Sequence, residues 1–89
     1  MSRRFSTTEL SYLKGLIRMA GGEWLAHPAR SLTVQTLPKG KQVQALLIKM
    51  PQHEVVALTA PLHSELAAVE RLCDFVESRA FDKLGIKSI

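Results

Sequence analysis

Residues 42–60 read QVQALLIKMPQHEVVALTA, two apolar runs on either side of a short polar turn at residues 51–53. Apolar side chains occupy consecutive positions at 45–48 in the first run and at 55–58 in the second. Because successive side chains of a strand point to opposite faces, both faces of these two strands are apolar. A small sheet of this kind needs cover on both sides. The predicted strands are residues 42–50 and 54–60.

A third strand precedes them. In residues 31–37, Leu32 and Val34 alternate with Thr33 and Gln35, which is typical of a half-buried strand. The PKGK segment at residues 38–41 predicts the hairpin turn that joins it to the next strand. In such a meander the middle strand is central and the last strand is an edge. An apolar edge strand without cover promotes aggregation, so we expect it to be paired or covered.

Helices are expected on both sides of the strands. Residues 6–9, STTE, form a capping box, and Gly21-Gly22 predicts the end of the helix that follows. Gly15 weakens this helix by about 1 kcal/mol relative to Ala, so either tertiary packing offsets the cost or something approaches the backbone there. Residues 23–30 form a connector. The last helix is expected to begin near Pro61 and to end at Gly85.

The fold class is therefore α+β in the order α-β-β-β-α, a three-stranded antiparallel meander with an N-terminal and a C-terminal helix. We expect one domain over residues 1–89, with a flexible basic arm at 1–5 and a tail at 86–89. Each helix could cover one face of the sheet, or both could share one face and leave the other to a partner. The predicted core is Leu13, Leu16, Ile17, Leu32, Val34, Leu47, Val56, Leu66, Val69, Leu72, Cys73 and Val76.

The composition limits the class of protein. The chain has 89 residues, 46% hydrophobic and 22% charged, which is globular and leaves no room for a second domain. No apolar run approaches the ~18 residues of a membrane span, and residues 1–5, MSRRF, do not open a secretory signal. The single cysteine, Cys73, suits a reducing compartment, so we expect a cytoplasmic protein without a membrane partner.

Residues for catalysis are scarce. The glycines lack the spacing of a phosphate-binding loop, and the histidines, His27, His53 and His63, lack the spacing of a zinc site. Cys73 lies in an apolar helical stripe beside Asp74, which is typical of a buried thiol rather than a nucleophile. The carboxylates Glu70, Asp74 and Glu77 are explained by a solvated helix face. We expect no enzymatic activity, no metal and no cofactor.

The charge is unevenly distributed. Residues 1–50 carry eight Lys or Arg against two acids, a net +6, whereas residues 51–89 carry four against six, a net −2. A soluble surface that happens to be basic explains this, and so does a surface that binds phosphates. The candidate residues for binding nucleic acid are Arg3, Arg4, Lys14, Arg18, Lys39 and Lys41.

The α-β-β-β-α order also resembles that of double-stranded RNA-binding domains. In that family the last helix begins with lysines that grip phosphates across a groove. Here the corresponding stretch, residues 61–65, reads PLHSE and holds one acid and no lysine. Tyr12 is the only aromatic candidate for stacking on a base. The resemblance is one of element order, without the family's main binding device.

Surplus apolar residues favour protein binding instead. The two-sided sheet and the apolar edge strand leave side chains that one core does not need, and such surplus commonly marks an interface. A homodimer explains it most simply, and helices on opposite faces of the sheet would remove it. The candidate interface residues are Val56, Leu58, Phe75, Phe81, Ile86 and Ile89. We therefore expect a non-enzymatic adaptor, inhibitor or regulatory protein that acts as a homodimer, with nucleic-acid binding as the alternative.

Overall fold

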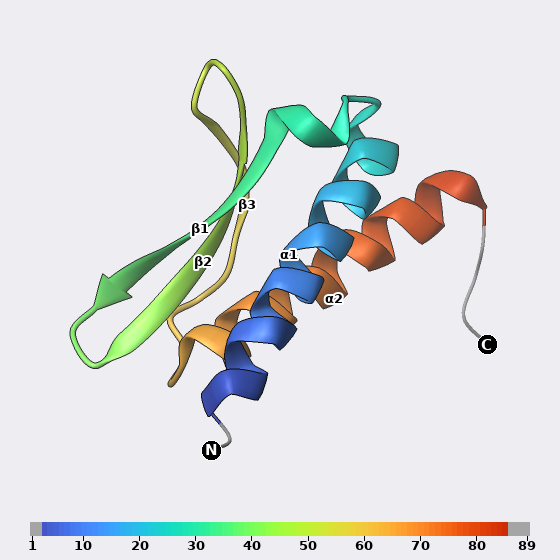
Figure 1. The fold of residues 1–89 in the computed structure, drawn as a ribbon. Helices are drawn as coiled ribbons and strands as arrows, with labels where there is room; N and C mark the ends of the chain where they lie inside the picture. Colours follow the sequence, from blue (N-terminus) through green and yellow to red (C-terminus); the bar gives the residue numbers. More distant parts are fainter. Residues whose placement is uncertain (1–2, 86–89) are drawn as a thin grey trace.

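The computed structural model describes residues 3–85, with side chains from Glu9 onward. An N-terminal helix is followed by a three-stranded antiparallel meander and a C-terminal helix, so the predicted α+β class is confirmed (Figure 1). The elements are α1 (Arg3–Leu25), the short 3-10 helix η1 (Ala29–Ser31), β1 (Leu32–Lys39), β2 (Gln42–Lys49), β3 (Glu54–Leu58) and α2 (Glu65–Leu84).

The sheet has the order β1-β2-β3, so β2 is central and β3 is an edge, as the meander predicts. Pro38 and Lys39 still pair with β2, which leaves Gly40 and Lys41 as a two-residue turn and makes the hairpin tighter than expected. At the other side of β2, Ile48 pairs with Val55 and Leu47 with Ala57. Val56 is therefore an extra residue in β3, a β-bulge that turns it to the same side as Ala57.

Both helices lie on one side of the sheet (Figure 1). α1 contacts β1, α2 contacts β2, and the two helices pack extensively against each other. Of the two arrangements that the sequence leaves open, this is the one in which the helices share a face. The buried cluster between helices and sheet is Ile17, Leu32, Val34, Ala45, Leu47, Ala68, Val69, Leu72, Cys73 and Val76.

Most of the predicted core is confirmed. Leu13, Leu16 and Val56 are only partly buried and pack against the cluster, and Leu66 is partly buried. The prediction missed three small residues that let the helices approach, Ala45, Ala68 and Ala80, each 3% exposed or less. Alanines carry little hydrophobic signal in a sequence, although they decide how closely elements pack.

The predicted bounds of α1 are wrong at both ends. The helix begins at Arg3, upstream of the STTE segment, so residues 3–5 are helical and Ser6 is not the cap. At the other end it passes through Gly21 and Gly22. A Cβ on Gly21 would lie 3.1 Å from Leu32 Cδ1 and 3.2 Å from Leu47 Cδ2, which explains a glycine at this position. Glycine here allows close packing rather than ending the helix.

α1 ends instead at Leu25, and the next residue, Ala26, has a left-handed backbone with φ 53°. The amide of His27 donates to the carbonyl of Gly22 at 3.1 Å, the six-to-one hydrogen bond of a Schellman motif. A Cβ on Gly22 would lie 2.9 Å from the His27 carbonyl oxygen, so this turn requires the glycine.

The start of α2 also differs from the prediction. Leu62 pairs with Val43 through two backbone hydrogen bonds of 2.7 and 2.8 Å, so the segment after β3 stays extended along β2. The buried Thr59 supports it, because its Oγ1 accepts from the Ala45 amide at 3.1 Å. α2 then begins behind Ser64, whose Oγ accepts from the Ala67 amide, and ends as predicted at a left-handed Gly85.

No helix within residues 3–85 is both long and apolar enough to cross a membrane.

Candidate binding surfaces

The face of the sheet that points away from the helices is the first candidate surface. The strand register places ten side chains on it: Thr33, Gln35, Leu37, Lys39, Gln42, Gln44, Leu46, Ile48, Val55 and Leu58. We call this set the open sheet face, because no element within residues 3–85 packs on it. One of the ten is charged, Lys39, and it lies at the end of the face next to the β1–β2 turn.

The middle of the open sheet face is already shielded by its own neighbours. Leu46 and Ile48 of the central strand are 8% and 6% exposed, yet neither belongs to the cluster under the helices. Around them, Leu37, Val55 and Leu58 are 43%, 44% and 57% exposed. Val55 and Leu58 of β3 therefore extend the buried central row into an apolar surface, whereas on β1 the residues beside that row are Thr33 and Gln35.

The predicted interface residues do not form one surface. Leu58 lies on the open sheet face, whereas Val56 packs against the core on the opposite side. Phe75 and Phe81 lie on α2, 41% and 47% exposed. Ile86 and Ile89 lie outside the described residues.

Phe75 has a role within the chain. Its ring meets that of Trp24 edge to face, with centroids 5.8 Å apart, and this contact joins α2 to the end of α1. The guanidinium of Arg79 also lies over the Phe75 ring, 5.2 Å from its centroid. Trp24 also packs against the core, so it is an internal anchor between the two helices.

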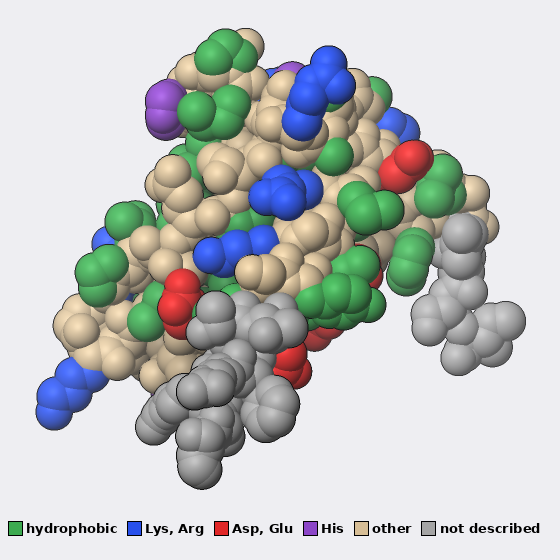
Figure 2. Space-filling view, viewed as in Figure 1, with side chains coloured by type: hydrophobic (Ala, Val, Ile, Leu, Met, Phe, Trp, Pro, Cys, Tyr) green, Lys and Arg blue, Asp and Glu red, His purple; other side chains and the backbone are tan. Residues whose placement is uncertain are grey.

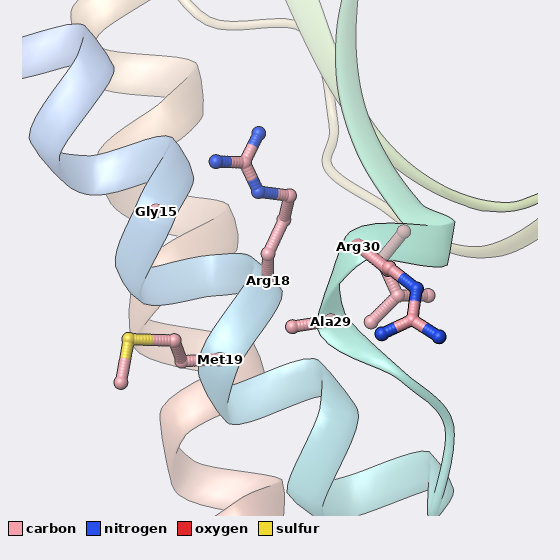
Figure 3. Close-up of a pocket in the computed structure, with 6 residues that line it drawn as sticks. Gly15, Arg18, Met19, Ala29 and Arg30 are labelled. Carbon is pink, nitrogen blue, oxygen red and sulfur yellow. The ribbon is translucent and has the colours of Figure 1, made fainter.

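The second candidate surface is basic and lies over α1. Figure 2 shows Lys and Arg side chains spread across the face on which α1 lies. Lys14 and Arg18 are one helical turn apart, and Arg18 lines a pocket of about 460 Å³ together with Arg30 of η1. The rest of the lining is Gly15, Met19, Ala29 and Leu32 (Figure 3).

The other predicted basic residues lie elsewhere. Lys39 and Lys41 are exposed at the β1–β2 turn, at the end of β1 away from Arg30. With a rise of about 3.3 Å per residue, β1 separates them from the pocket by roughly 23 Å. Arg3 and Arg4 lie in the first turn of α1, and the structure does not describe their side chains.

The structure also describes the surroundings of the Cys73 thiol and of the residues that could hold a metal ion. Burial above all, with the negative charges of Glu77 and Asp74, raises the pKa of the Cys73 thiol from 9.0 to about 11. A thiol that stays protonated in this way is a poor nucleophile. Among the side chains that the structure describes, no group of three His, Cys, Asp or Glu is placed to hold a metal ion.

Sequence reasoning missed Arg30 as a basic-surface residue, because only the folded chain brings η1 beside α1. It also left Leu37, Leu46, Ile48 and Val55 out of the interface, although the pairing of strands with two apolar faces was the signal for them. The chain matches no family model, no curated protein and no solved structure.

Proposed function

We propose that this protein is a non-enzymatic binding protein of the cytoplasm, an adaptor, inhibitor or regulator, that assembles as a homodimer through the open sheet face. The observation that carries the proposal is the position of the two helices. Both pack on one side of a sheet in which β2 and β3 are apolar on both sides, so the outer apolar side chains of these two strands are left for a partner.

A second copy of the chain suits this face better than a charged partner. The open sheet face carries a single charge, Lys39 at its hairpin end, so a two-fold axis across the middle of the strands would keep the two lysines at opposite ends of the interface. Two such sheets can pack face to face about 10 Å apart, as in a β-sandwich. The exposed Leu37, Val55 and Leu58 would then meet their counterparts and lose the most contact with water.

The test is the sedimentation of purified protein at low and high salt, with Leu58→Lys and Leu84→Lys as a matched pair. The two leucines are 57% and 54% exposed, but only Leu58 lies on the open sheet face. We expect the wild type and Leu84→Lys to be dimers at both salt concentrations, because apolar contact is not screened. Leu58→Lys should be a folded monomer, because a dimer would bury two unpaired ammonium groups.

A wild-type monomer, or a Leu58→Lys variant that remains a dimer, would contradict the proposed interface. Circular dichroism of the variants separates loss of assembly from loss of folding.

The second candidate function is nucleic-acid binding, and the basic surface of Lys14, Arg18 and Arg30 favours it. Among the side chains that the structure describes, no carboxylate is within ion-pair distance of these three cations. In double-stranded RNA-binding domains the last helix begins with lysines, but here α2 begins with Glu65. The basic surface of this chain lies on α1 and η1. Adding a short DNA duplex to the same sedimentation experiment tests it. A monomer that moves with the duplex at low salt and leaves it at high salt would favour this function over the dimer.

A further inference from the structure

No neighbouring atom in the described chain requires residue 15 to be glycine. Of the three glycines in α1, Gly21 and Gly22 are held to glycine by neighbours within 3.2 Å of where a Cβ would be. At Gly15 a Cβ would meet no atom within 4 Å. Close packing within the described chain therefore does not explain a residue that weakens a helix interior. A ligand that contacts the helix backbone at this position would explain the glycine.

The space in front of Gly15 is the pocket between α1 and η1 (Figure 3). Arg18 reaches it from α1 and Arg30 from η1, and none of its six lining residues is acidic. The backbone that carries Arg30 is held in place, because the Ser31 amide donates to the Pro28 carbonyl and the Ser31 carbonyl accepts from the Met50 amide. Two arginines from separate elements thus line one pocket, and because Figure 3 shows their guanidinium groups pointing away from each other, both side chains must turn to reach a ligand between them.

We propose that this pocket binds a phosphate group, which the guanidinium groups of Arg18 and Arg30 hold while the ligand lies against the α1 backbone at Gly15. The pocket lies on the helix side of the molecule, so the proposal goes beyond the dimer and does not depend on it. It also needs no polynucleotide, because a phosphomonoester on a small molecule presents the same chemistry.

The number of donors favours phosphate over carboxylate. One guanidinium already satisfies both oxygens of a carboxylate through a bidentate pair. A phosphate offers more acceptor oxygens and more negative charge, so it can engage two guanidinium groups at once. The buried Leu32 and the half-buried Ala29 add an apolar wall for the part of the ligand that carries the phosphate.

The experiment follows the amide signals of the full chain by NMR during titration at constant ionic strength. The probes are inorganic phosphate, acetate, a nucleoside 5′-monophosphate and a short single-stranded oligonucleotide. We expect the phosphate probes, and not acetate, to shift the amide of Gly15 and the side-chain N–H signals of Arg18 and Arg30. The double variant Arg18→Gln/Arg30→Gln should weaken nucleotide binding by about tenfold or more.

The matched control is Lys39→Gln/Lys41→Gln, which removes the same charge at the far end of β1 and should leave the affinity within about twofold. Gly15→Ala provides a second readout. It should raise the Tm by several degrees, because alanine favours the helix, and yet weaken binding by filling the space at the backbone.

The probes also distinguish the source of the phosphate. A mononucleotide that binds as tightly as the oligonucleotide indicates a small ligand, whereas tighter, salt-dependent binding of the oligonucleotide indicates a strand. Either result supports a phosphate site. Equal shifts with acetate, equal losses in the two double variants, or a Gly15→Ala protein that binds as well as the wild type would overturn the proposal.

Discussion

Cys73 is a residue at which burial and charge act in the same direction. Its side chain is 3% exposed in the core, and the acidic neighbours Glu77 and Asp74 oppose ionisation further, so its pKa rises to about 11. The thiol therefore contributes to packing as a small apolar group.

This environment predicts slow alkylation. At pH 8 the folded protein should react with iodoacetamide far more slowly than the protein in guanidinium chloride, in which the thiol regains its ordinary pKa. Mass spectrometry over time measures both rates, and similar rates in the two conditions would contradict the buried site. The same shift makes stability fall as the pH rises from about 9 to about 11, because the unfolded thiol ionises first.

Elements differ in how much of them the sequence predicts. The three strands and their order follow from runs of apolar residues and from the turn residues between them. Helix ends are harder, because glycine can either end a helix or allow close contact, and only Leu32 and Leu47 against Gly21 decide which. The start of α2 depends likewise on the pairing of Leu62 with Val43, which is a contact between distant segments.

The contribution of the Ser64 cap to the stability of α2 can be tested by mutation. Ser64 Oγ accepts from the Ala67 amide at 3.1 Å, and Ser64→Ala leaves that amide without its partner. We expect a loss of about 1 kcal/mol, which lowers the Tm by roughly 4–8 °C in a domain of this size. Ser78→Ala, an exposed site within α2, is the control and should leave the Tm nearly unchanged. Thermal unfolding followed by circular dichroism measures both, and equal shifts would contradict the cap.

At the scale of the whole molecule, the candidate surfaces depend on which side of the sheet the helices take. The sequence shows that both faces of β2 and β3 are apolar, but it does not reveal that α1 and α2 share one of them. In the folded chain the two helices pack against each other on that face, with Trp24 and Phe75 among their contacts. The same packing brings η1 beside α1 and so places Arg30 near Arg18.

If the dimer forms, its thermal unfolding depends on protein concentration. Mass action should raise the Tm by roughly 3–5 °C for each tenfold increase in concentration, because association stabilises only the folded state. Leu58→Lys should unfold at one temperature whatever the concentration. Scanning calorimetry over two decades of concentration is the measurement, and a constant wild-type Tm would contradict a dimer that unfolds as one unit.

The place of α2 in the chain has a consequence for synthesis on the ribosome. α2 supplies half of the buried residues under the sheet, yet it follows all three strands in the sequence. At about 5–20 residues per second, translation needs roughly one to five seconds to proceed from the end of β3 to the end of α2. For that interval β2 and β3 lack the cover that α2 gives them, and their apolar side chains can take part in aggregation.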